Sequence, residues 1–160
     1  VAWGQSLMHS DRPSALLLSR QNLPAQARDA LQVDAITRGG YVLADEPQAR
    51  ATIIATGSEV QVAVAARALL AAQGMPVRVV SMPSTTVFDR QSKAWRDGVL
   101  GAVPRFAVEA GVTRGWGDYG CIATLGVDTY GESAPAPALF EHFGITAERL
   151  AAMVQSAVHG

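Results

Sequence analysis

Three charged side chains stand where an α/β protein commonly places functional groups. Arg20 follows an apolar run, Ala15 to Leu18, which predicts a buried strand. Ligands of parallel sheets gather at the carboxyl ends of strands, so Arg20 is a candidate site residue, while its local context favours a solvated loop arginine. Glu109 ends another predicted strand, and its local chemistry favours a cap for the glycine-rich turn that follows. Glu132 lies in a Gly/Ser/Pro loop, where its carboxylate can accept backbone N–H groups.

The other reactive side chains form no catalytic constellation. No pair of the three histidines, His9, His142 and His159, has metal-ligand spacing, and His142 is interpreted as an exposed helical residue. Cys121 has no neighbouring His or carboxylate in the sequence and is interpreted as a small residue near the core. GxSxG, GxxxxGK(S/T) and CxxC motifs are absent. Local chemistry alone therefore indicates no catalytic apparatus.

A strand, a helix and a second strand between residues 51 and 82 organise the chain. The β-branched run Thr52 to Ala55 predicts a buried strand, and Val77 to Ser81 predicts the next one. Val60 to Ala72 is rich in Ala and Leu, without Pro or Gly, which predicts the helix between them. The two strands of such a unit are expected to be parallel, with a right-handed crossover.

The ends of this helix carry recognisable signals. Ser58 with Gln61 has the spacing of a capping box at the start, and Gly74 is expected at the left-handed position after the end. A phosphate at the helix start is disfavoured, because only Gly57 of a GxGxxG pattern is present and Glu59 adds a carboxylate to the first turn. A capped scaffold helix is the favoured interpretation.

The remaining pattern predicts an open, mostly parallel α/β sheet with helices on both faces. Residues 1–12 are expected to end a helix, and 24–40, with two glycines at its end, to be a linker or domain boundary. Further strands are expected at 41–43, 105–110 and 122–127, and further helices at 84–88, 90–99, 138–143 and 146–158, with Trp95 on a buried side and Thr146 as an N-cap.

Composition narrows the class of protein. The chain has 160 residues, of which 49% are hydrophobic and 17% charged, as is typical of a globular protein with a core. A net charge of −1 without a basic stripe argues against nucleic acid as a partner, and no apolar run is long enough to suggest a membrane span. The single cysteine fits a reducing cytoplasm. Because the chain begins at Val1, we expect it to be part of a larger protein.

Six segments together closely resemble bacterial transketolases, in the order of that family and over nearly the whole chain. They are SRQNLP at 19–24, RGGYVL at 38–43, IIATGSEVQVAV at 53–64, VRVVSMPSTTVFDRQ at 77–91, VEAG at 108–111 and GVDTYGESAPAPALFEHFGIT at 126–146. The resemblance is to the end of the family's chain. It implies that residues 1–24 are the tail of the middle, pyrimidine-binding domain, that 25–40 are a linker, and that 41–160 are the Rossmann-like C-terminal domain.

The resemblance also implies a function. The family transfers a two-carbon ketol unit between sugar phosphates in the pentose phosphate pathway, with thiamine diphosphate and Mg²⁺ or Ca²⁺ at the interface of a cytoplasmic homodimer. Arg20 matches the family arginine that binds the sugar phosphate, which reverses the interpretation drawn from its local context. The family's GDG motif is missing, and GDYG at 117–120 does not replace it. Catalytic, cofactor-binding and metal residues are therefore expected in the missing domains, and none in this chain.

Two other functions remain open from the sequence. One is a non-catalytic assembly or regulatory-binding module of a thiamine-dependent enzyme. The other is a related thiamine-dependent transferase such as dihydroxyacetone synthase, which the segments SMPST and GESAP disfavour. As a transketolase fragment, the chain alone is expected to be inactive and to bind no cofactor.

Overall fold

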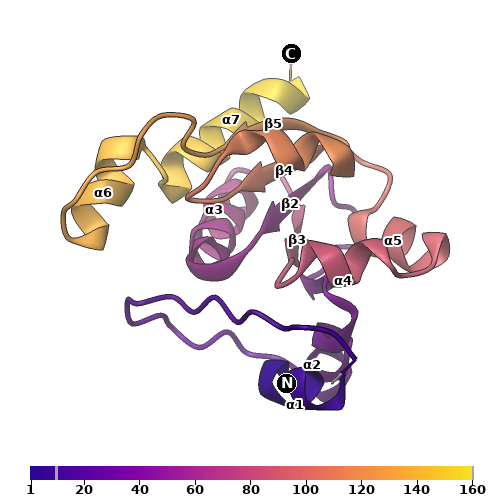
Figure 1. The fold of residues 1–160 in the computed structure, drawn as a ribbon. Coiled ribbons are helices and arrows are strands. Elements are labelled where there is room, and N and C mark those ends of the chain that lie inside the picture. Colours follow the sequence, from indigo (N-terminus) through magenta and orange to yellow (C-terminus); the bar gives the residue numbers. More distant parts are fainter. Residues whose placement is uncertain (10, 160) are drawn as a thin grey trace.

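The computed structural model describes residues 1–9 and 11–159, whose centre is one sheet in the order β1-β3-β2-β4-β5 (Figure 1). The strands are β1 (Tyr41–Ala44), β2 (Ala51–Ala55), β3 (Val77–Ser81), β4 (Arg105–Val108) and β5 (Cys121–Leu125). Four of them are parallel to one another, and β1 pairs with β3 in the antiparallel direction. The predicted open, mostly parallel sheet is therefore confirmed.

Helices cover both faces of the sheet. Successive strand residues point to opposite sides, so both faces carry apolar side chains that must be buried. Ile53, Val79 and Phe106 pack under α3 (Val60–Ala72) and α7 (Ala147–His159), with α6 (Ala136–Phe143) beside them. The neighbouring residues Ile54, Val80 and Ala107 belong to a second core, formed with α4 (Thr85–Asp89), α5 (Lys93–Leu100) and the 3₁₀ helix Thr113–Tyr119. No described helix is long and apolar enough to cross a membrane.

The unit β2–α3–β3 forms as the sequence predicts. Its two strands are parallel, with Ile53 opposite Val79, and all five residues of β2 are buried. Gly74 has φ 72° and donates its N–H to the Ala71 carbonyl, while the Met75 N–H bonds to Leu70 at 2.9 Å. These two bonds form a Schellman motif, which ends α3 where the glycine predicts.

The predicted capping box at Ser58 is wrong. A 3₁₀ turn, Gly57–Glu59, precedes α3, and no side chain caps either element. The Ser58 hydroxyl instead donates to the adjacent Glu59 carboxylate. The extra turn places Ser58 outside α3, so its side chain no longer has the geometry to accept from the N–H groups of the first α-helical turn.

The N-terminal segment lies apart from the sheet (Figure 1). Its first part is α1 (Ala2–Met8), in agreement with the expected helix. Residues 15–18 are not a strand, which corrects the sequence prediction, and Leu17 is 92% exposed. A strand requires a neighbour for its backbone N–H and C=O groups, and the described part of the chain supplies none at this position.

The expected linker contains ordered structure that is fastened to the sheet. Asp29 and Gln32 form a capping box at the start of α2 (Ala30–Ala35), which continues into a 3₁₀ helix, Ile36–Arg38. The Gln32 amide also donates to the carbonyls of Val42 and Leu43, at 3.0 and 2.9 Å. Because β1 is an edge strand, this side chain occupies acceptors that would otherwise face solvent.

The glycine pair at the end of this segment is a close-packed joint. Gly39 has φ 81°, and a Cβ there would overlap the Ser84 carbonyl and lie 2.5 Å from the Phe88 backbone nitrogen. A Cβ at Gly40 would lie 2.6 Å from the Met82 sulfur. Only glycine permits this approach, so the pair sets α2 against the domain.

Candidate functional site

Arg20 lies on the exposed N-terminal segment. Its side chain is exposed and has no hydrogen-bond partner among the described residues. The structure brings no other candidate site residue to it. Its role in binding a sugar phosphate therefore stays a prediction.

A groove of about 440 Å³ lies at the carboxyl ends of β2 and β3, and we call it the carboxyl-edge groove. Its walls come from three regions: the start of α3, the ends of β1 and β3, and the segment that follows Arg20. The lining residues are Leu23, Pro24, Ala25, Gln26, Arg28, Ile36, Tyr41, Gly57, Ser58, Val60, Gln61, Ser81 and Pro83. Its place matches the edge where α/β sheets commonly bind ligands.

Polar contacts fix two side chains in this groove. The Arg28 Nε donates to the Tyr41 hydroxyl at 2.6 Å, and its Nη1 donates to the Gln26 carbonyl at 2.8 Å. The Arg28 guanidinium also lies 5.9 Å from the centre of the Tyr41 ring. Tyr41 is only 2% exposed, so it forms a rigid wall to which Arg28 is attached.

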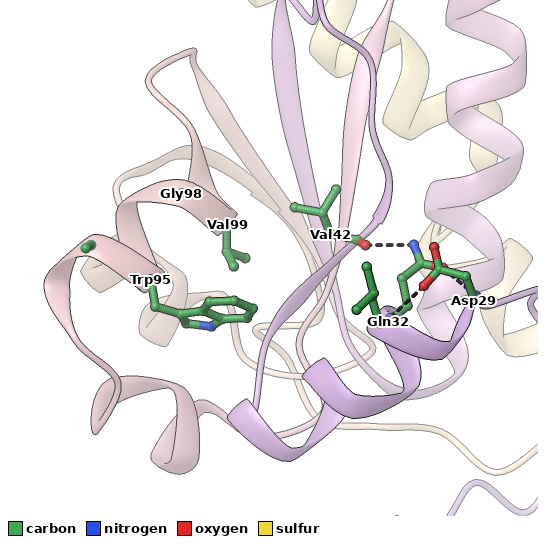
Figure 2. Close-up of a pocket in the computed structure, with 8 residues that line it drawn as sticks. Asp29, Gln32, Val42, Trp95, Gly98 and Val99 are labelled. Atoms are coloured by element: carbon green, nitrogen blue, oxygen red, sulfur yellow. Dashed lines mark hydrogen bonds between the residues drawn. The ribbon is translucent and has the colours of Figure 1, made fainter.

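A smaller groove of about 290 Å³ lies between α2 and α5 (Figure 2). Val42, Trp95 and Val99 form its apolar floor, while Asp29 and Gln32 form a polar rim. The Trp95 indole donates to the Gly40 carbonyl at 3.3 Å, and Arg38 stacks 4.2 Å above its ring. Trp95 lies on the side of α5 that packs against the second core, as predicted, and it is partly buried there. Its contacts join α5 to the Gly39–Gly40 pair.

Glu109 holds the glycine-rich segment through a side-chain contact and does not cap it as expected, because no side chain caps the 3₁₀ helix Thr113–Tyr119. Its carboxylate accepts from the Trp116 indole at 2.9 Å, and Trp116 is buried in the second core. Farther along the same 3₁₀ helix, the Tyr119 hydroxyl donates to Asp89 at 3.0 Å. Burial, with this hydrogen bond and the Asp89 charge, raises the pKa of Tyr119 to about 12. Both contacts hold the segment against the sheet.

Among the described residues, Cys121 and the histidines His9 and His142 belong to no metal-ligand cluster. Cys121 is half-buried against the second core, and burial raises the pKa of its thiol to about 11, which keeps it a neutral thiol. His142 is exposed on α6, with its ring edge against Phe143. Glu132 is exposed in its loop. The side chain of His159 lies outside the described residues.

Sequence reasoning missed the residues of the carboxyl-edge groove. Ser81 ends a predicted parallel strand, and that position was the available signal. Arg28 and Tyr41 come from the expected linker and from an edge strand that is antiparallel, so no periodic pattern linked them to Ser81.

Comparisons with known proteins agree on one family. A family model described as "Transketolase-like TK C-terminal domain" matches residues 39–146. Transketolase 1 of Escherichia coli is 50% identical over 157 residues, which is 95% of this chain and 24% of that protein. The chain therefore spans about a quarter of the curated relatives that it matches.

Solved structures show the same relationship. Transketolase from Leishmania mexicana superposes with a TM-score of 0.81 at 38% identity, covering 88% of this chain and 20% of that one. A structure titled "Split gene transketolase, inactive beta4 tetramer" superposes with a TM-score of 0.60 at 27% identity, covering 88% of this chain and 48% of that one. The fold, the matched residues and the sequence identity lead to one conclusion: the chain belongs to the transketolase family and corresponds to its C-terminal domain.

Proposed function

We propose that this chain is the C-terminal part of an intact transketolase that transfers a two-carbon ketol unit between sugar phosphates. The observation that carries the proposal is the 50% identity with a bacterial transketolase over 95% of the chain. This match extends beyond residues 39–146, which the family model covers. Its partners are then the preceding domains of the same polypeptide and a second copy in a cytoplasmic homodimer.

The residues present do not fit a thiamine diphosphate or cation site. Among the described residues, no three His, Cys, Asp or Glu side chains are grouped as metal ligands. Asp118 of the GDYG segment is exposed within a 3₁₀ helix, and the adjacent Tyr119 packs against the core rather than leaving a cradle. Thiamine diphosphate and Mg²⁺ or Ca²⁺ are therefore assigned to the preceding domains of the proposed enzyme.

Arg20 is the residue of this chain that we assign to the substrate. A guanidinium suits a terminal phosphate, because its planar fork gives two parallel hydrogen bonds and keeps its charge at any working pH. Its exposure leaves the side chain free to meet a substrate held by the other domains.

The proposal is tested by comparing the complete polypeptide with residues 1–160. The complete protein should transfer ketol units from a ketose phosphate to an aldose phosphate, whereas the chain alone should have no activity. Calorimetry with thiamine diphosphate and Mg²⁺ should show binding only to the complete protein. Micromolar cofactor binding by the 160-residue chain would contradict the assignment of that site to the missing domains.

A second function, assembly without catalysis, is favoured by one observation. A chain from a split-gene transketolase, similar to this one, has been solved in a form titled an inactive tetramer. A self-assembling module would form a defined oligomer alone, and its removal would leave the activity of the complete protein unchanged. The enzymatic function instead requires that activity be lost from the complete protein when this part is removed.

A further inference from the structure

We propose that the carboxyl-edge groove is an oxyanion-binding site, distinct from Arg20, that takes a phosphate or carboxylate group. Its buried hydroxyls, its tethered guanidinium and the open start of α3 converge on one groove. The volume of about 440 Å³ is within the range of small-ligand sites.

Ser81 is the first observation that points to a ligand. It is 5% exposed, lines the groove, and has no hydrogen-bond partner for its hydroxyl among the described residues. By strand alternation its side chain lies on the same face as Val79, under α3, and it stands opposite Tyr41 in the β1–β3 pairing. The hydroxyl is not sealed in the interior without a partner; it opens onto the groove, where an occupant can accept its hydrogen bond.

Arg28 and Tyr41 supply donors beside it. Two nitrogens of the Arg28 guanidinium are occupied by Tyr41 and Gln26, whereas Nη2 has no partner among the described residues. The Tyr41 oxygen accepts from Arg28, and its own O–H donates to no described group. The Arg28–Tyr41 contact therefore fixes the position of the guanidinium charge. Nη2 of Arg28 and the O–H of Tyr41 stay available as donors.

Backbone donors complete the set at the start of α3. The N–H groups of Gly57 and Ser58 donate to no carbonyl of the described backbone, and no side chain caps the turn. The unused groups around the groove are thus donors from Ser81, Arg28, Tyr41 and the backbone. A ligand rich in acceptors satisfies all of them, and an oxyanion does so with the charge that Arg28 requires.

Glu59 opposes an anion less than its position in the sequence suggests. It is 4% exposed, accepts the Ser58 hydroxyl, and is absent from the groove lining although residues on both sides belong to it. Its side chain is therefore turned away from the groove. It still reduces the positive field of the helix start, so the affinity comes mainly from Arg28 and the hydroxyls, and we expect dissociation constants in the millimolar range.

The test is a titration of the ¹⁵N-labelled chain with inorganic phosphate, followed by NMR. The amide signals of Gly57, Ser58 and Ser81 should shift saturably, and hydrogen exchange at residues 25–28 should slow, because the ligand joins that segment to the sheet. Ribose 5-phosphate and malonate in separate titrations distinguish a phosphate ester from a free carboxylate, and neutral ribose should produce no shift. Potassium chloride at matched ionic strength controls for salt.

Two variants should weaken phosphate binding at least tenfold: Arg28→Gln, which removes the charge, and Ser81→Ala, which removes the free hydroxyl. Arg38→Gln is the matched control, since Arg38 stacks on Trp95 outside the groove. Unchanged spectra of the variants without ligand would verify their fold. The proposal is overturned if the shifts do not saturate, if chloride reproduces them, or if Arg28→Gln binds as tightly as the control.

Discussion

Arg20 lacks the intramolecular contacts that hold Arg28 and Arg78, and its proposed ligand is the phosphate of a substrate. Arg28 is held by Tyr41 and Gln26, and Arg78 by Asp45 at 2.8 Å, whereas Arg20 is exposed without a partner among the described residues. Its assignment rests on the SRQNL segment, which follows the order of the family. Substrate kinetics distinguish a phosphate-binding arginine from a solvated one.

Arg20→Ala in the complete enzyme should lower kcat/KM for phosphorylated substrates by roughly ten- to a hundredfold, from the loss of charge-assisted hydrogen bonds. The phosphate lies far from the bond that breaks, so KM should change more than kcat. Arg20→Lys should rescue only part of the loss, because an ammonium cannot give the bidentate pair. Kinetics with ribose 5-phosphate and with an unphosphorylated aldehyde measure the effect. An equal loss for both substrates would show that Arg20 supports the fold and does not bind the phosphate.

Tyr119 should make the stability of the domain depend on alkaline pH. Its pKa is raised from 10.0 to about 12 by burial and by Asp89. Between these values the folded chain retains a phenol proton that the unfolded chain has lost, so the free energy of unfolding should fall as pH rises through this window and should be unaffected below it. Urea unfolding below pH 10 and near pH 12 should show this fall, and Tyr119→Phe should reduce it. An identical pH profile for the variant would assign the alkaline loss to other groups.

At the scale of elements, the sheet could be predicted from the sequence because its signals are local. The β-branched runs of β2 and β3 are long enough to be identified as strands. The unbroken Ala/Leu run between them is long enough to be identified as a helix. Gly74 marked the end of α3 because a left-handed residue is needed there. These are features in which propensity, periodicity and capping agree.

The wrong predictions arose where the structure differs from what the local sequence pattern alone would require. Ala15–Leu18 has the composition of a strand but no neighbouring strand among the described residues. Ser58 has the spacing of a cap, yet an additional 3₁₀ turn displaced it. The α2 helix is short and weakly periodic, and its stability comes from Gln32 reaching β1 ten residues away.

Among the residues of the expected linker, Gln32 should contribute most to the free energy of unfolding, through its bonds to the edge strand β1. Gln32→Ala removes the reciprocal half of the capping box and both bonds to β1, and should lower the free energy of unfolding by about 1–3 kcal/mol. Gln26→Ala is the matched control, because its amide makes only a local contact with Pro24. Chemical denaturation of both variants measures the difference. A Gln32→Ala midpoint equal to that of the control would mean that α2 does not stabilise the domain.

At the scale of the whole molecule, the chain divides into a part that packs on the sheet and a part that does not. The residues from Asp29 onward are joined to the sheet by α2, by the Gly39–Gly40 joint and by partly buried Ile36. The residues before them expose large apolar side chains, among them Trp3, Leu7, Leu17 and Leu18. We therefore expect the folding unit to begin near residue 26, earlier than the domain start at 41 expected from the resemblance.

Shortened chains test this boundary. A chain of residues 26–160 should unfold cooperatively with nearly the melting temperature of the full chain, because the removed apolar residues bury little surface in it. A chain of residues 41–160 should still fold but should melt about 10 °C lower, since it loses the Gln32 bonds and the packing of Ile36. It should also associate with rising concentration, because the edge of β1 loses its cover and can pair with another copy. Calorimetry and light scattering over a range of concentrations measure both effects. Equal melting temperatures for the two shortened chains would place the boundary at 41 and make α2 a true linker, whereas loss of cooperative melting in residues 26–160 would show that the N-terminal segment belongs to this domain.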